Sequence, residues 1–326
     1  MPNHNNPSPG RTLSALLAGL FALDGYAATY PLPPPGIDVV GDVQVTYARY
    51  EDTFVEIARR HDMGFDEMVQ ANPGVSAWLP GEGTPVVVPS RFILPKAPRE
   101  GIVLNVPEMR LYYYPKGQNV VITHPVGIGR EEWKTPLGKT TVVTKVKDPV
   151  WRPPASIRAE HAAEGDYLPE VVPAGPDNPL GQYALRLGIP GYLIHGTDKP
   201  NGIGMRVTHG CVRLYPEDIE SLFRSVPVGT PVYLVNQPVK VGWNGYSLEM
   251  EVHQPLEEDR AQFGNLVDTA VRLVASTPNP TAIPIDPALV QTAVEQSSGL
   301  PVLLTPEQTA MQQPAILPSQ SQFTLQ

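Results

Sequence analysis

The sequence contains a single cysteine among its 326 residues, so it cannot form an internal disulfide. Cys211 is therefore a partner-linking thiol, a small buried hydrophobe or a nucleophile, and its neighbourhood must decide which. Positive charge is also scarce, because 24 Lys and Arg stand against 33 Asp and Glu, a formal net charge of −9. This balance argues against a nucleic-acid partner, whose binding depends mostly on Lys and Arg.

The apolar stretch near the N-terminus is too short to span a bilayer, which takes about 20 apolar residues. It runs from Leu13 to Leu23, after Arg11 and before small residues that end at Ala28. This is the layout of a secretory signal rather than of a membrane anchor. We therefore predict a signal peptide over residues 1–27, cleaved near Ala27 or Ala28, and no stable membrane span in the exported chain.

Charged residues make up only 17% of the chain, whereas proline is abundant, with 39 residues. Such a composition indicates a loop-rich globular protein dominated by strands, of mainly β (α+β) class. The length predicts two or three modules. Residues 28–43, which include TYPLPPPGIDVVG, are predicted to be a proline-rich linker.

Residues 44–90 predict a small β-α-α-β domain. Strands are expected over 44–47 and 84–88, and helices over 53–61 and 64–71, with Thr53 and Asp66 at positions where helices are commonly capped. The run EDTFVEIARRHDMGFDEMVQANPG followed by LPGEGTPVVVP resembles the LysM family of glycan-binding modules. That family usually has Gly-Asp-Thr where this chain has Glu51-Asp52-Thr53. A small structural prodomain is the alternative.

Residues 100–236 predict a β-rich domain, because Val-, Ile-, Thr- and Tyr-rich runs recur between Pro, Gly and Asn turns. Residues 149–181 are expected to be an irregular lid over a site. A helix is predicted over 216–225 and a closing strand at PVYLV. The C-terminal extension, 237–326, predicts a hairpin turning at Asn244-Gly245, a helical stretch over 256–275 and a disordered end of about 20 residues.

The reactive residues concentrate in HGTDKPNGIGMRVTHGCVRLYPED, which begins at His195. A thiol is mostly protonated at neutral pH, so a nucleophilic Cys211 needs a base such as His195 nearby. Gly210 lets the backbone turn its amides inward, which makes the N–H groups of His209, Gly210 and Cys211 candidates for an oxyanion hole. Arg213 points to the same side as Cys211 if this run is extended, and it can hold a carboxylate.

This run resembles the catalytic signature of L,D-transpeptidases of the YkuD family, and GIGREEWKTPLGKTTV at 127–142 resembles the family's other landmark. VVPAGPDNPLGQYAL at 171–185 resembles the periplasmic ErfK/YbiS/YcfS/YnhG branch. The resemblance implies a YkuD-type catalytic fold, with Cys211 as nucleophile, His195 as general base and the Gly196 carbonyl as its orienter. It also implies that Arg213 and Thr208 line the donor site, and that no cofactor or metal is needed.

The expected reaction is acyl transfer on peptidoglycan stem peptides through a thioester on Cys211. The acceptor stays open between the C-terminal lysine of an outer-membrane lipoprotein and a second diaminopimelate, which would give 3-3 cross-links. Alternatives are a hydrolase that uses water and a non-catalytic protein that only binds glycan strands. A zinc site built from His195, His209 and Cys211 is a further alternative. His124 and His253 lie outside the cluster and are expected at the surface.

Overall fold

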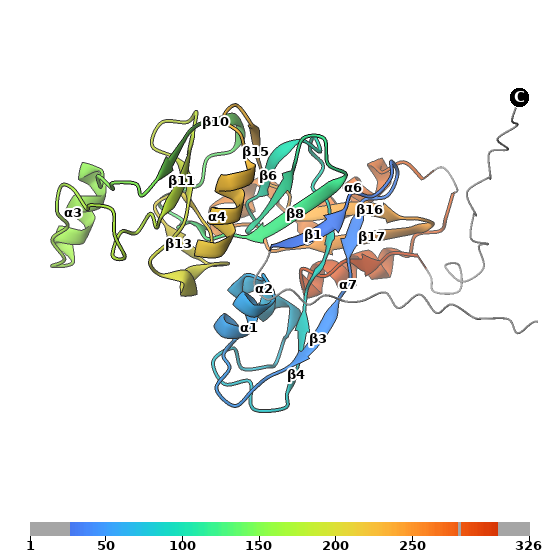
Figure 1. Ribbon diagram of the computed structural model, residues 1–326. Coiled ribbons are helices and arrows are strands. Elements are labelled where there is room, and N and C mark those ends of the chain that lie inside the picture. The colour runs from blue at the N-terminus through green and yellow to red at the C-terminus, as the bar shows by residue number, and fades with distance from the viewer. Residues whose placement is uncertain (1–26, 280–281, 306–326) are drawn as a thin grey trace, which may run out of the picture.

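The computed structural model describes residues 27–279 and 282–305, and its centre is a nine-stranded sheet (Figure 1). The predicted mainly β class is confirmed. In spatial order the strands are β1 (Ala28–Pro31), β8 (Val120–Pro125), β7 (Arg110–Tyr114), β6 (Gly101–Asn105), β15 (Pro231–Val235), β10 (Gly138–Lys147), β11 (Tyr183–Leu187), β12 (Leu193–His195) and β14 (Val212–Arg213).

The long strand β10 divides the sheet into two parts. Its first residues pair with β15 and its last residues pair with β11, and the β10–β11 register shifts between Val142 and Thr144. Such an irregularity bends a strand and increases its twist. The short strands β12 and β14, which are parallel to each other, thus lie beyond the bend, and β9 (Ile128–Gly129) pairs with β13 (Arg206–Thr208) beside them.

The predicted β-α-α-β unit is present as β3 (Gln44–Tyr47), α1 (Phe54–Arg60), α2 (Phe65–Ala71) and β4 (Pro85–Val88), with β3 and β4 antiparallel. Thr53 caps α1 in a capping box with Glu56. Asp66 is not a cap, contrary to expectation, because α2 begins after Gly64. There the Glu67 carboxylate accepts the Gly64 N–H at 2.6 Å.

This unit shares a hydrophobic core with the central sheet rather than hanging from a linker. Phe54 and Ile57 belong to the same buried cluster as Tyr112 and Val121. A Cβ added at Gly64 would lie 2.8 Å from the Cα of Gly204, so the two backbones approach closely at this point. The unit therefore packs directly against the segment that carries the predicted catalytic residues.

Residues 28–43 are not the spacer that the prolines suggested. Ala28–Pro31 forms β1 at the edge of the central sheet, and β2 (Val39–Gly41) pairs with β5 (Arg91–Ile93). Proline is tolerated at an edge strand, where a missing N–H breaks no ladder, so the composition did not distinguish an edge from a linker. The predicted signal peptide lies outside the described residues except for Ala27.

Two helices modify the predicted catalytic domain. The expected lid over 149–181 contains α3 (Ala155–Ala163), which projects away from the rest of the chain in Figure 1. The predicted helix over 216–225 is confirmed as α4 (Pro216–Ser225), with a proline in its first turn. Across residues 27–279 and 282–305, no helix has the length and apolar character needed to cross a membrane.

The C-terminal extension forms a third hydrophobic core around the predicted hairpin of β16 (Val239–Asn244) and β17 (Ser247–Val252). Asn244 pairs with Ser247, so the turn is Gly245-Tyr246, one residue later than expected. The stretch predicted as one helix is interrupted at Gly264, which adopts φ 56° between α5 (Arg260–Phe263) and α6 (Leu266–Ser276). The prediction also missed α7 (Pro287–Gln296) and β18 (Val302–Leu303). The predicted disordered end lies outside the described residues.

His124 and His253 are buried, with 1% and 3% exposure, so their prediction as surface residues was wrong. His253 Nε2 lies 2.7 Å from Glu251, whose carboxylate also binds the buried Lys240 ammonium at 2.7 Å. Lys240 in turn contacts Glu108 of the central sheet at 2.9 Å. These paired charges join the extension to the catalytic domain. The local sequence does not predict them, because the partners lie far apart in the chain.

Candidate active site

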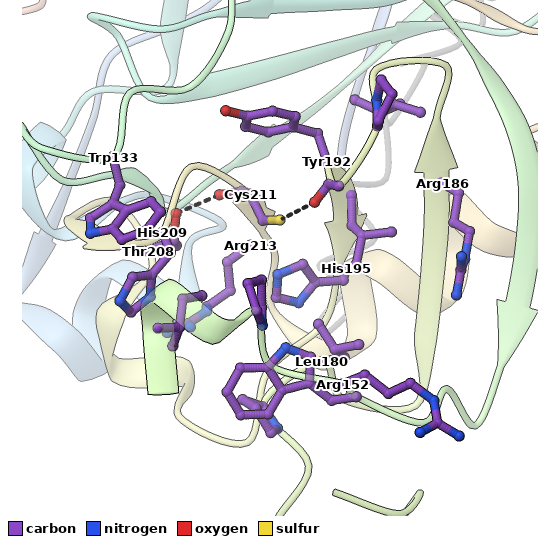
Figure 2. A pocket seen from close by; sticks show the side chains of 18 of the residues that line it. Trp133, Arg152, Leu180, Arg186, Tyr192, His195, Thr208, His209, Cys211 and Arg213 are labelled. Carbon is purple, nitrogen blue, oxygen red and sulfur yellow. Dashed lines mark hydrogen bonds between the residues drawn. The ribbon is translucent and has the colours of Figure 1, made fainter. Parts of the chain in front are cut away.

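Cys211 and His195 lie on the neighbouring strand ends that the bend in the sheet brings together. Ile194 of β12 pairs with Val212 of β14, and His195 pairs with Arg213, in parallel register. Because side chains alternate along a strand, His195, Cys211 and Arg213 all face the same side. Figure 2 shows their side chains directed into one pocket.

The pocket has a volume of about 900 Å³ and is bounded on one side by the segment that contains α3. Its lining mixes aromatic and aliphatic side chains with a few polar groups, as is usual for a ligand site. Besides the three residues above, it includes Trp133, Trp151, Arg152, Leu180, Arg186, Tyr192, Thr208 and His209.

The imidazole of His195 is held by one short hydrogen bond and is neutral. Its Nδ1 lies 2.6 Å from the Gly196 carbonyl oxygen, the contact that the sequence predicted. A carbonyl can only accept, so Nδ1 carries the proton and Nε2 keeps a free lone pair. Burial, reinforced by the charge of Arg213, lowers the pKa of His195 to about 3. His195 is therefore able to accept a proton at any ordinary pH.

The thiol of Cys211 is also neutral in this arrangement. Burial raises the pKa of Cys211, although a backbone hydrogen bond and the charge of Arg213 oppose the shift. Its Sγ lies 3.7 Å from the Gly191 carbonyl oxygen, the bond drawn in Figure 2. The resting pair is thus thiol and imidazole rather than thiolate and imidazolium. Attack on a substrate requires the thiol to turn from Gly191 and transfer its proton.

Thr208 lines the pocket, as the resemblance implied, and it also supports the loop that carries Cys211. Thr208 is 2% exposed, and its hydroxyl donates to the Cys211 carbonyl at 2.6 Å and accepts the Gly210 N–H at 3.1 Å. The amide of Gly210 is therefore already engaged, and this removes it from the predicted oxyanion hole. The amides of His209 and Cys211 donate no hydrogen bond to the other described residues.

Gly210 is required at this turn by two independent constraints. Its φ is +96°, a region that other residues rarely adopt, and an added Cβ would lie 2.8 Å from the ring of Tyr192. Thr135 holds the turn from the other side, donating to the Gly210 carbonyl at 3.0 Å and accepting the Gly129 N–H at 3.1 Å. Sequence reasoning noticed the segment containing Thr135 but gave this residue no role.

Arg213 has a half-buried guanidinium that forms no ion pair with the other described residues. Its Nε has no hydrogen-bond partner. Burial lowers the pKa of Arg213, whereas Asp198 and Cys211 raise it. A half-buried cation that faces the pocket without an ion-pair partner is suited to a carboxylate ligand, as predicted from its spacing to Cys211.

His209 faces away from the thiol and belongs to a separate polar cluster. Its Nε2 lies 3.0 Å from Arg130 and 3.2 Å from Glu160, and its ring contacts Trp133 edge-on at 5.1 Å. The ligand atoms of His195, His209 and Cys211 are not among the sets in the described chain that converge within 4.8 Å. The zinc alternative therefore lacks its ligand geometry. The sequence analysis did not predict that Arg130 and Glu160 would contact His209.

Comparison with known proteins shows the family to which this chain belongs. The pattern of the YkuD L,D-transpeptidase catalytic domain matches residues 99–234. The chain is 45% identical over 302 residues to the probable L,D-transpeptidase YbiS of Escherichia coli K12, covering 90% of this chain and 98% of that protein. The chain belongs to the YkuD family of L,D-transpeptidases.

Two further relatives match this L,D-transpeptidase with similar identity and over a similar share of the chain. The probable L,D-transpeptidase ErfK/SrfK of Salmonella typhimurium is 44% identical over 299 residues, covering 88% of this chain and 93% of the relative. The probable L,D-transpeptidase YcfS of Escherichia coli K12 is 43% identical over 304 residues, covering 89% and 92%. The similarity thus extends well beyond the 136 or so residues of the catalytic pattern into the parts that pack on it.

Proposed function

We propose that this L,D-transpeptidase acts in the periplasm on peptidoglycan stem peptides, with Cys211 as nucleophile and His195 as general base. The main support for this proposal is the 2.6 Å hydrogen bond from His195 Nδ1 to the Gly196 carbonyl oxygen. It fixes the tautomer whose free Nε2 can take the thiol proton within the pocket that Cys211 lines. The predicted signal peptide supports the location outside the cytoplasm.

In the first half-reaction, the sulfur of Cys211 attacks the carbonyl carbon of diaminopimelate at stem position 3 while His195 takes the thiol proton. The carbonyl oxygen becomes an oxyanion, for which the amides of His209 and Cys211 are the available donors. The bond to D-alanine then breaks, His195 returns the proton to the leaving amine, and a thioester remains on Cys211.

In the second half-reaction, an amine attacks the thioester, gives its proton to His195 and restores the thiol. We propose a lipoprotein C-terminal lysine as the acceptor, on the resemblance of 171–185 to the ErfK/YbiS/YcfS/YnhG branch, with a second diaminopimelate as the alternative. The test is to incubate the enzyme with tetrapeptide stems and a lipoprotein C-terminal peptide, and to analyse the products by mass spectrometry. A stem–lysine conjugate supports the proposal, a 3-3 dimer supports the alternative, and tripeptide alone identifies a hydrolase.

Arg213 is the proposed anchor for a substrate carboxylate. We expect Arg213→Met to lower kcat/KM for a tetrapeptide donor by about 10- to 100-fold, because a hydrogen bond to a charged group contributes about 1.5–3 kcal/mol. A donor whose terminal carboxylate is converted to an amide should lose little from the same substitution. Arg186→Met is the matched control, since Arg186 lines the same pocket but lies on β11. Equal losses for both donors would contradict the role.

The LysM-like unit is proposed to hold glycan strands. Several of its aromatic and aliphatic side chains are exposed, notably Tyr50 at 82% and Trp78 at 61%, and such rings are suited to stacking on sugars. We expect Tyr50→Ala with Trp78→Ala to reduce retention on insoluble sacculi several-fold while leaving turnover of a soluble donor unchanged. Tyr167→Ala, an exposed tyrosine outside the unit at 80%, is the control. Unchanged retention would indicate a purely structural unit.

A further inference from the structure

A second group of buried ionisable side chains lies away from the catalytic pocket, where the LysM-like unit meets the central sheet. Asp62 follows α1, His124 lies on β8 and Asp218 lies in the first turn of α4. One ligand atom from each of the three lies within 4.8 Å of the others. His124 and Asp218 are 1% and 3% exposed, so this cluster is sealed from solvent at the sheet and at α4.

The cluster contains two carboxyl groups, and the part of the chain that the structure describes provides no free cation to balance them. Burial lowers the pKa of His124 to about 4, so its imidazole is neutral. The nearby Arg110 guanidinium is bound to Glu67 at 2.7 and 2.8 Å. Nδ1 of His124 lies 3.2 Å from Oδ1 of Asp218, whereas Oδ2 of Asp218 has no hydrogen-bond partner. Two adjacent buried carboxyl groups, one with an oxygen that lacks a hydrogen-bond partner, are suited to a positively charged donor.

The group that reaches this site is the backbone nitrogen of Ala28. It donates to Asp62 Oδ2 at 2.9 Å, and Ala28 is the first residue of β1, paired with Thr123 next to His124. The signal-peptide cleavage predicted from the sequence falls near Ala27 or Ala28. Hydrolysis of the Ala27–Ala28 bond takes up one water, leaves the carboxylate on Ala27 and turns the Ala28 nitrogen into an α-ammonium.

We propose that the Asp62/His124/Asp218 cluster is the binding site for the N-terminal ammonium of the mature chain, which pairs with Asp62 and has Asp218 and His124 as neighbouring acceptors. The inference rests on the export that we propose above, but not on the acyl-transfer chemistry. The ammonium supplies three donors in place of one amide N–H, enough for Asp62 and for the Asp218 oxygen that lacks a partner.

The titration behaviour of the carboxyl groups agrees with a missing cation. Burial raises the pKa of Asp62, and a neighbouring carboxylate, that of Asp218, raises it further. Burial and the charge of Glu217 raise the pKa of Asp218 to about 7. Arg59, which could otherwise offset these charges, is paired with Glu217 at 2.9 Å. An ammonium at the Ala28 nitrogen would favour the ionised carboxylates and reverse these shifts.

The consequence is that removal of the signal peptide completes the native structure. Before cleavage the cluster buries acidic groups without a cation, which destabilises the fold of a chain that must cross a membrane. After cleavage, the ion pair fastens β1 to the loop after α1 and to α4. Because α4 follows the Cys211 strand directly, the same contact braces the base of the catalytic motif.

The test is a double-mutant cycle on the full mature chain. Two N-termini, Ala28 itself and Ala28 preceded by one retained alanine, are each combined with Asp62 or Asp62→Asn, and denaturant unfolding is measured for the four proteins. With Ala28 as the terminus, Asp62→Asn should raise the unfolding equilibrium constant by about 10²- to 10³-fold, the loss typical of a broken buried pair. With the extra alanine, the same change should have an effect below about 10-fold. Asp177→Asn, at an exposed site, should have no effect in either background.

A second experiment measures how readily the N-terminal amine is acetylated. The α-amine of the folded mature chain should resist acetylation at neutral pH and become reactive in Asp62→Asn, as seen by mass spectrometry of the N-terminal peptide. Equal effects of Asp62→Asn in both backgrounds would overturn the proposal. So would stability that depends on a divalent cation and falls on chelation, or a mature chain that begins elsewhere than Ala28. None of these readouts involves turnover, so failure here is separable from failure of the transpeptidase proposal.

Discussion

Cys211→Ala is expected to abolish transpeptidation, with a loss of about 10⁴-fold or more, because the proposed thioester forms on the sulfur that this change removes. The variant should fold normally, since the change removes one small atom from a partly exposed side chain. The measurement is release of D-alanine from a tetrapeptide donor, with thermal unfolding as the check on folding. Cys211→Ser is the informative companion, because it keeps the shape of the side chain and replaces a soft nucleophile by a weaker one.

Retention of more than about 1% of the activity in folded Cys211→Ala would contradict the covalent route. In that case water or the acceptor amine would have to attack the stem directly. A folded but inactive Cys211→Ser alongside an inactive alanine variant would show that the thiol, and not the shape of the side chain, is required.

His195→Ala is expected to lower the rate of acylation by about 10²- to 10⁴-fold, the usual contribution of a positioned general base. His209→Ala should reduce this step far less, because its imidazole contacts Arg130 and Glu160 rather than the thiol. Single-turnover acylation of the two variants makes the comparison. If His209→Ala were the slower of the two, the roles assigned to the two histidines would be reversed.

The pH dependence of acylation provides an independent check on His195. The folded pKa of about 3 lies below the ordinary value, so the neutral imidazole is present throughout the range from pH 5 to 8 and is lost only near pH 3. The rate should therefore show no inflection near pH 6.5 that His195→Ala removes. Such an inflection would mean that His195 titrates normally and that the neutral pair described above is wrong.

The candidate catalytic residues could be selected from the sequence because they lie close together in the chain. Cys211 is the chain's single cysteine and His195 is one of seven histidines, and both lie in one short segment. Strand alternation places Arg213 on the same side as Cys211. The contact between His195 and Gly196 is confirmed because it joins adjacent residues. The two backbone contacts of Thr208 were not predicted, because a short sequence motif does not show which backbone groups a hydroxyl will bind.

The predictions that were wrong concern contacts between residues far apart in the chain. Nothing in the sequence near His124 indicates that it will pair with Asp218 of α4. Similarly, nothing near Glu251, the partner of His253, indicates that the buried Lys240 of another strand will pair with it. Likewise, the prolines of 28–43 predict extended backbone but not whether a strand finds an edge to pair with. The third core of the extension was missed because α7 is short and lies in a segment rich in proline and glutamine.

The central claim is that Cys211 is the nucleophile, and the most direct test is the mass of the intact protein after brief incubation with a carbapenem. The carbonyl group of this acylating compound is expected to react with the thiol as the carbonyl of the stem peptide does. The account predicts a single covalent adduct on the wild-type protein, located by peptide mapping on the fragment that contains Cys211, and none on Cys211→Ala. An adduct of the same mass on the alanine variant, or on a fragment without Cys211, would contradict the assignment of Cys211 as the nucleophile.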